Sequence, residues 1–381
     1  MTGMRFLHTA DWQLGMTRHF LDADAQARFT DARLDAISRL GAVAACHEAE
    51  FVVVCGDVFE DNRLAPAVIA RSLDRIAAID RPVYLLPGNH DPLDAASIYT
   101  SEVFARHRPA NVVVLDAPGV HEVRPGVELL AAPWFSKHPA GDPLTEAVAA
   151  AAPPAAGVVR IAVGHGGTLP VGAQDQRLID VAALSQRIAA GELRYVALGD
   201  RHSVTEVAEG VWYSGAPEVT AFDHKEHGSG SVLVVEVPES GAPEVTAERV
   251  GTWRFASREF PLSSEADVAA AVAALSALPD KDRTVVKVGF TGTVGLGAKA
   301  ALDDELEALR ARFAAVELWE RKTDLAVLPG EVELESLELT GPAAGAAEEL
   351  LGVARSGAER AADAAGALAL LYRLTRQEVG E

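Results

Sequence analysis

The sequence predicts an α/β protein followed by a smaller α+β domain and a helical C-terminal tail. Up to about residue 240, short runs rich in β-branched residues alternate with alanine-rich stretches of helical spacing. Runs such as FVVVC and VVRIAV are largely apolar on both faces, which is typical of strands buried inside a parallel sheet. Polar residues directly follow five of these runs, at the strand end where open α/β sheets place their sites.

Residues 1–240 are expected to form the α/β domain. Its helices are predicted at residues 23–49, 65–79 and 179–190. Its strands are predicted at residues 5–9, 51–55, 83–86, 112–115, 128–131, 159–163, 195–198 and 231–237. Residues 238–247 (PESGAPEVTA) are rich in Pro, Gly, Ser and Glu, and this composition predicts a connector.

Behind the connector, residues 248–328 predict a compact α+β domain. Strand patterns at 253–262, 283–290 and 315–322 alternate with helical patterns at 264–278 and 303–314. Apolar residues at roughly helical spacing then predict a helical tail over residues 330–381. The tail is expected either to pack on its own domain or to dock a partner protein, and the sequence favours neither.

Composition narrows the class of protein. A chain of 381 residues exceeds what one core usually absorbs, so at least two domains are expected. Two cysteines exclude a disulfide framework, and the early Asp11 and the lack of a long apolar run predict a cytoplasmic protein without a membrane segment. The net charge of −21 argues against unaided binding to nucleic acid. A bound divalent metal would, however, supply local positive charge.

The polar residues after the five strands predict a metal site. Glycine precedes four of the clusters, and a residue without Cβ lets the chain turn sharply and approach the site closely. Carboxylates, imidazoles and a carboxamide gathered together need cations to compensate them. Nitrogen and oxygen ligands without thiolate suit Mn²⁺, Mg²⁺, Fe or Zn²⁺. The clusters are Asp11-Trp12-Gln13, Gly56-Asp57, Gly88-Asn89-His90-Asp91, Gly164-His165 and Gly199-Asp200-Arg201-His202.

The same clusters carry a family resemblance. HTADWQLG, CGDVFED, PGNHD, VGH and ALGDRH, in this order, resemble the five motifs of the calcineurin-like metallophosphoesterases. More narrowly, LHTADWQLG and the later YSGAPE resemble the nuclease subunits (SbcD-type) of SbcCD-type DNA repair complexes. The resemblance implies an αββα sandwich, a capping domain and a helical segment that binds an SbcC-like ATPase subunit.

The resemblance also implies a role for each motif residue. Two divalent ions would activate a water molecule for in-line attack on a phosphodiester. His90 would be the catalytic histidine, which stabilises the phosphate or protonates the leaving alkoxide. A further acidic residue of the site would be either Glu60 or Asp61. The implied metal ligands are Asp57 as the bridge, Asp11, Gln13 and His202 at one ion, and Asn89, His165 and Asp200 at the other.

Two positions depart from the family pattern. Gln13 stands where the first motif usually has histidine, and Asp200 stands where the last motif does. Both changes replace an imidazole by an oxygen donor, which favours harder ions, Mn²⁺ first and Mg²⁺ as the alternative. Arg201 lies between two implied ligands and is expected to touch a substrate phosphate.

These observations favour a metal-dependent DNA exo/endonuclease subunit that works with an SbcC-like ATPase in DNA repair. Its expected partners are DNA and the ATPase, and a homodimer stays open. A phosphoesterase for small substrates is the first alternative, because it fits the negative charge better. The second is a degenerate phosphoesterase that serves as a scaffold, which the changes at Gln13 and Asp200 motivate.

Overall fold

The computed structural model describes residues 3–169, 175–327, 339–356 and 360–378. The chain divides into two compact units. The first comprises Met1–His19 and Gln26–Trp253, and the second Phe20–Ala25 and Arg254–Glu381. All five motif clusters fall in the first unit.

The first unit is built on two six-stranded sheets. In the first sheet β1 to β4 are parallel neighbours, and in the second β6, β7, β8 and β10 are parallel. The first has the order β12-β11-β1-β2-β3-β4, with β1 (Met4–Thr9), β2 (Val52–Cys55), β3 (Val83–Leu86), β4 (Val112–Val114), β11 (Ser231–Val237) and β12 (Glu244–Arg249). The second has the order β5-β6-β7-β8-β10-β9, with β5 (Gly119–Arg124), β6 (Val127–Ala131), β7 (Val159–His165), β8 (Tyr195–Gly199), β9 (Thr205–Ala208) and β10 (Val211–Tyr213).

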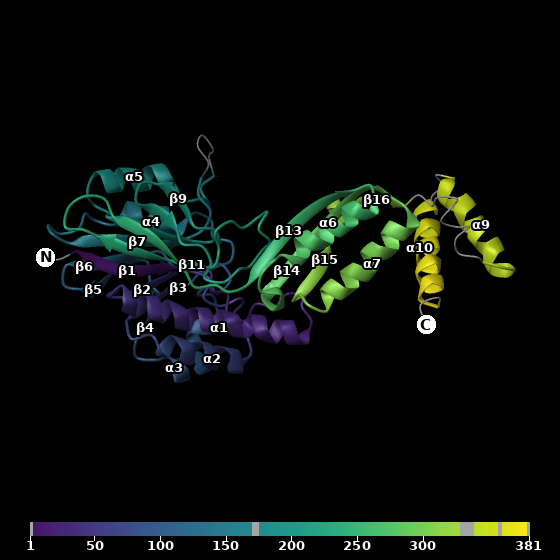
Figure 1. Cartoon of the computed structure of the whole chain (residues 1–381). Helices are drawn as coiled ribbons and strands as arrows, with labels where there is room; N and C mark the ends of the chain where they lie inside the picture. Colours follow the sequence, from purple (N-terminus) through teal and green to yellow (C-terminus); the bar gives the residue numbers. More distant parts are fainter. Residues whose placement is uncertain (1–2, 170–174, 328–338, 357–359, 379–381) are drawn as a thin grey trace. The chain divides into compact units, whose positions relative to one another are not determined.

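The two sheets face each other through an apolar core. Phe6 of the first sheet meets Tyr195 of the second edge to face, with ring centroids 5.6 Å apart. Helices cover both outer faces, which gives the layers of an αββα sandwich (Figure 1). The expected fold class is therefore confirmed. The first sheet carries α1 (Ala23–Cys46), α2 (Pro66–Ala77), the short η1 (Ile98–Thr100) and α3 (Glu102–His107), and the second carries α4 (Pro143–Ala150) and α5 (Val181–Ala189).

All eight strands and three helices expected in this unit are present. The expectation that residues 238–247 are only a connector is wrong, because β12 begins at residue 244 and pairs antiparallel with β11. Its alternating sequence EVTAER suits an edge strand with one face toward solvent. Strand β5 was not expected, since its residues are half-buried and lack a run of apolar side chains.

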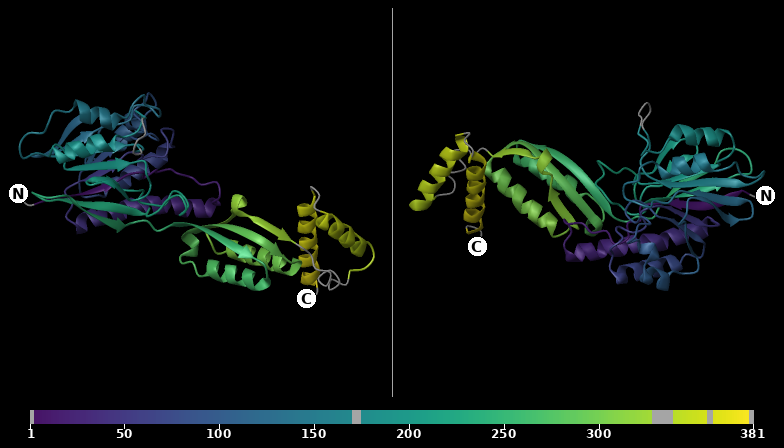
Figure 2. Two further views of the ribbon diagram at one scale, coloured as in Figure 1. Left: turned by 90° about the horizontal axis from the view of Figure 1, so that it is seen from above. Right: turned by 180° about the vertical axis from the view of Figure 1, so that it is seen from behind.

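The second unit contains a parallel sheet in which β14 is central. Helices α6 and α7 pack on this sheet through leucine, valine and phenylalanine side chains (Figure 2). The helix expected at 303–314 begins earlier, because Leu296, Ala300 and Leu302 are already buried at helical spacing. The elements are β13 (Arg254–Leu262), α6 (Glu265–Ser276), η2 (Lys281–Arg283), β14 (Thr284–Val294), α7 (Leu296–Arg310), β15 (Ala315–Leu318), η3 (Glu320–Lys322) and β16 (Asp324–Val327).

The described part of the C-terminal tail forms two helices, α9 (Pro342–Arg355) and α10 (Ala361–Glu378). Buried Ala347 of α9 and Leu368 of α10 pack with Leu296 and Ala300 of α7. These helices therefore pack on their own unit, while the expected boundary at residue 330 lies outside the described residues. No helix in the described ranges is both long and apolar enough to span a membrane.

Candidate metal centre

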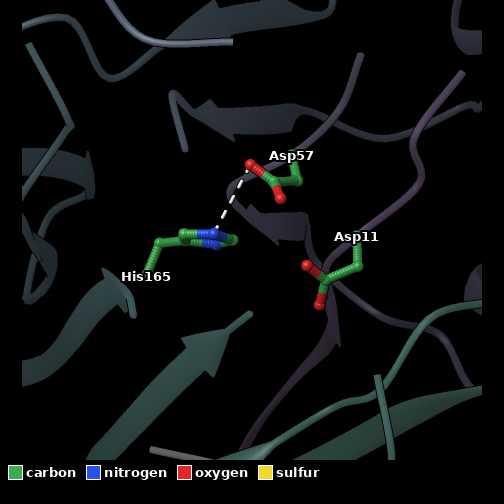
Figure 3. A group of neighbouring side chains, drawn as sticks. All are labelled: Asp11, Asp57 and His165. Atoms are coloured by element: carbon green, nitrogen blue, oxygen red, sulfur yellow. Dashed lines mark ion pairs between the residues drawn. The ribbon is translucent and has the colours of Figure 1, made fainter. Parts of the chain in front are cut away.

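The topology brings the five clusters to one edge of the sandwich. Three of them follow β1, β2 and β3, neighbours in the first sheet, and two lie at the ends of β7 and β8, neighbours in the second. Ligand atoms of Asp11, Asp57 and His165 all lie within 4.8 Å of one another. Figure 3 shows these three side chains pointing toward a common centre. We call the eight candidate residues around this centre the cup: Asp11, Gln13, Asp57, Asn89, His90, His165, Asp200 and His202.

His165 stands at the middle of one half of the cup. Its Nε2 atom lies 2.6 Å from Oδ1 of Asn89, 3.4 Å from Oδ1 of Asp57 and 3.9 Å from Oδ1 of Asp200. Its Nδ1 donates a hydrogen bond to the carbonyl oxygen of Cys55 at 2.8 Å. One ring nitrogen is thus held by the backbone, and the other faces three oxygen donors.

His202 belongs to the other half of the cup. Its Nε2 lies 3.8 Å from Oδ1 of Asp11 and 3.5 Å from Nε2 of Gln13. The structure therefore groups the two halves as the motif resemblance implied, with Gln13 beside Asp11 and His202 and with Asp200 near His165.

His90 lies beside Asp57 with its ring partly open to solvent. Its backbone N–H donates to Oδ1 of Asp57 at 2.9 Å, and its Nε2 lies 4.0 Å from Oδ2. Its Nδ1 donates to the carbonyl oxygen of Glu60 at 2.9 Å. The carboxylate of Glu60 lies 4.0 Å from the same Nδ1, whereas Asp61 pairs with Arg63. Of the two acidic residues considered, Glu60 is the one next to His90.

The backbone is strained where it presents ligands. Asp11, Gln13, Asp57 and Asp200 all have positive φ, at 53°, 42°, 53° and 98°. Such conformations cost free energy for residues with a Cβ and gather at functional sites. Close packing also needs glycine: a Cβ at Gly88 would lie 2.3 Å from Oδ1 of Asp57. The sharp turns after the strands are thus what points these side chains into the cup.

The electrostatics of the cup call for a cation. Asp11, Asp57 and His165 are all almost fully buried. Burial raises the pKa of Asp11 to about 7, although His202 and His165 act to lower it. Burial acts to lower the pKa of His165, but the charges of Asp57, Asp11 and Asp200 outweigh it and raise it to about 10. Protons on imidazoles thus stand in for positive charge among the carboxylates.

An unpaired acceptor supports the same conclusion. The carbonyl oxygen Oε1 of Gln13 is buried and has no hydrogen-bond partner among the described residues. A buried polar atom of this kind normally requires a partner, and a divalent ion is one that a carbonyl oxygen serves well. The donor set of this chain therefore fits divalent metal.

Arg201 is not drawn into the cup. Its guanidinium lies over the ring of Tyr213, 5.9 Å from the centroid, and the residue is exposed. A phosphate contact by Arg201 remains a prediction.

Several residues that support the cup carry no motif signal in the sequence. Buried Arg33 donates to the carbonyl oxygen of Trp12 through Nε and Nη2, at 3.2 and 2.7 Å, and so holds the turn between Asp11 and Gln13. Trp134 donates from Nε1 to the carbonyl oxygen of His165 at 2.7 Å. These residues are far away in sequence, so only the folded chain reveals them.

The geometry and donor set define a metal-dependent phosphoesterase, and comparison with known proteins agrees. Residues 4–225 match the family described as calcineurin-like phosphoesterase, so the chain belongs to that family. Over 108 residues it is 32% identical to the SbcD component of the nuclease SbcCD from Bacillus subtilis (strain 168). That match covers 26% of this chain and 26% of the relative, so the chain spans about a quarter of the relative's length.

Solved structures with a similar fold include TT1561 of Thermus thermophilus, at 11% identity and a TM-score of 0.41. The match covers 65% of this chain and 100% of that one. A dimetal phosphatase from Danio rerio is similar at 11% identity and a TM-score of 0.40, over 65% of this chain and 99% of that one.

Proposed function

We propose that this protein is a cytoplasmic, metal-dependent nuclease that cleaves phosphodiester bonds in DNA as the partner of an SbcC-like ATPase. The observation that carries the proposal is the cup, in which Asp11, Asp57 and His165 converge within 4.8 Å. The partial identity to a nuclease component supports DNA over other phosphodiesters. The helices α9 and α10, where Leu370 is 53% exposed, are the proposed docking site for the ATPase.

The cup residues would hold two divalent ions, with Mn²⁺ proposed first and Mg²⁺ second. Such ions polarise a phosphate and lower the pKa of the attacking water. Asp57 lies between the two halves and is the residue placed to serve both ions. Oxygen donors from Gln13 and Asp200 favour hard ions over Zn²⁺.

His90 is the residue of this chain placed to handle a proton. Because Nδ1 donates to the carbonyl oxygen of Glu60, the second nitrogen, Nε2, faces the cup. In the imidazolium form Nε2 carries a proton toward the substrate. That proton can stabilise a phosphate oxygen or pass to the leaving alkoxide, which becomes a hydroxyl group. With 37% of its side chain exposed, His90 can then recover a proton from solvent.

The test uses the purified full-length chain with Mn²⁺. Single- and double-stranded DNA oligonucleotides are incubated with the wild type and with the His90→Asn variant, alongside bis(p-nitrophenyl) phosphate. The proposal expects cleavage of DNA by the wild type and a loss of about 100-fold or more in the variant. DNA left intact by the wild type contradicts it.

A small-substrate phosphoesterase is the second candidate, because the net charge of −21 disfavours a long polyanion. Rapid hydrolysis of the small ester with no cleavage of DNA would select it. If neither substrate reacts and no metal binds, the scaffold alternative is selected instead.

A further inference from the structure

The three imidazoles of the cup are oriented in two different ways. His165 and His90 each donate from Nδ1 to a backbone carbonyl oxygen. The Nδ1 of His202 instead meets the hydroxyl of Thr220, at 2.5 Å from Oγ1. Thr220 belongs to no motif and lies 18 residues further along the chain.

Behind Thr220 lies a buried carboxylate, that of Glu226. Its Oε2 accepts the hydrogen bond of the Thr220 hydroxyl at 2.5 Å, and its Oε1 accepts from the backbone N–H of Thr220 at 3.1 Å. Oε2 is also 3.6 Å from Nδ1 of His202. Thr220 and Glu226 are 2% and 6% exposed, so this chain of contacts is shielded from water.

The direction of the hydrogen bonds fixes where the protons are. A carboxylate only accepts, so the single hydroxyl proton of Thr220 points to Glu226. The Thr220 oxygen must then accept from His202, which places a proton on Nδ1. The amide Nε2 of Gln13, which can only donate, lies 3.5 Å from Nε2 of His202 and agrees with a lone pair on that nitrogen.

We infer that Glu226, acting through Thr220, is a positioning residue that fixes His202 as a metal ligand with its Nε2 lone pair toward Asp11. The inference rests on the proposed metal-dependent function. A carboxylate behind a ligand histidine sets the tautomer and increases the basicity of the ligand nitrogen. This matters most in the half of the cup that contains Gln13, because that half has only one imidazole.

Two arginines hold Thr220 in place. Nη2 of Arg18 donates to the carbonyl oxygen of Thr220 at 2.5 Å, and Nη1 of Arg33 donates to that of Val219 at 3.1 Å. The backbone at 219–220 is thus tied to the chain on both sides of the relay. The hydroxyl of Thr220 is therefore presented to His202 by a fixed backbone.

The experiment measures Mn²⁺ affinity by calorimetry, which does not depend on turnover. Thr220→Val removes the hydroxyl and keeps the shape, and its matched control, Thr220→Ser, keeps the hydroxyl. Glu226→Gln keeps the size, but an amide can accept from only one of the two Thr220 groups. We expect Thr220→Val and Glu226→Gln to weaken binding at the weaker of the two sites by about 10- to 100-fold, and Thr220→Ser to retain wild-type affinity.

A second readout separates positioning from a general loss of structure. In the Co²⁺-loaded protein the Nδ1–H proton of a ligand histidine gives a shifted, exchangeable NMR signal. We expect such a signal for His202 in the wild type and in Thr220→Ser, and its loss in Thr220→Val. Far-ultraviolet circular dichroism of the metal-free variants confirms that they are folded.

Equal Mn²⁺ affinity in Thr220→Val, Glu226→Gln and the wild type would overturn the inference, as would a His202 signal that survives in Thr220→Val. The proposed function fails separately. A wild type that binds metal but cleaves no phosphodiester would leave the affinities of these variants to decide the role of Glu226.

Discussion

The backbone N–H of Asp200 donates to both carboxylate oxygens of Asp11, at 3.2 and 3.1 Å. Asp11 follows β1 of the first sheet and Asp200 follows β8 of the second, so this contact joins the two sheets at the cup. It also ties a candidate ligand in one half of the cup to the backbone of a candidate ligand in the other. The positive φ of both residues, 53° and 98°, is what allows the contact.

Replacing Gln13 by histidine is expected to tighten Mn²⁺ binding by about tenfold. The buried Oε1 of Gln13 has no hydrogen-bond partner among the described residues, and imidazole is a stronger ligand than a neutral carbonyl oxygen. Isothermal titration of the metal-free protein measures the change. Gln26→His, in the same unit but not in the cup, is the control. An unchanged affinity in Gln13→His would show that position 13 does not touch the metal.

Replacing His90 by asparagine is expected to lower the hydrolysis rate without removing metal. His90 faces Asp57 only through a contact of 4.0 Å and carries its proton function at the open side of the cup. We expect kcat to fall by about 100- to 10,000-fold while the bound Mn²⁺ per chain stays at the wild-type value. Loss of metal together with activity would assign His90 as a ligand instead.

Replacing Gly88 by alanine is expected to disturb the cup from behind. The added Cβ would lie 2.3 Å from Oδ1 of Asp57, closer than atoms can pack. We expect the free energy of unfolding to fall by about 1–3 kcal/mol and the Mn²⁺ affinity to fall with it. Gly352→Ala, where no described atom lies within 4 Å of the added Cβ, is the matched control and should change neither. Wild-type affinity in Gly88→Ala would contradict the geometry.

Buried His8 is expected to make the folded state sensitive to acid. Burial lowers its pKa to about 3, whereas a histidine in the unfolded chain titrates near 6.5. Below about pH 6.5 the unfolded chain therefore binds a proton that the folded chain does not. The stability is complete above that pH and is lost as the pH falls toward 3. At pH 5 this amounts to about 2 kcal/mol.

Urea unfolding at pH 7 and pH 5 tests this, with His8→Gln compared to the wild type. The variant should lose about 2 kcal/mol less between the two values, because it has no imidazole to protonate. Exposed His138 provides the control, and His138→Gln should keep the wild-type dependence. Equal pH dependence in His8→Gln and the wild type would contradict the prediction.

The motif residues and the central strands could be predicted because each depends on local sequence. A buried parallel strand such as β2 needs apolar side chains on both faces, and the turn after it needs glycine, so both leave a pattern in the chain. The weakly patterned strands β5 and β12 could not be predicted in this way. They are edge strands that form because a neighbouring strand pairs with them.

The supports of the cup could not be predicted either. Arg33, Thr220 and Glu226 have no spacing or motif that separates them from other polar residues in the sequence. Their roles come from contacts across 21 residues in the case of Arg33 and Trp12, and across 18 in the case of Thr220 and His202. Only a folded backbone specifies such partners.

The most direct test of the metal cup is anomalous diffraction from crystals soaked in Mn²⁺, recorded for the wild type and for Asp57→Ala. We predict two anomalous peaks in the wild type, one beside Asp11, Gln13 and His202 and one beside Asn89, His165 and Asp200, with Asp57 touching both. Asp57→Ala should show neither peak. A wild type without a peak in the cup, or a variant that retains both, would contradict the account.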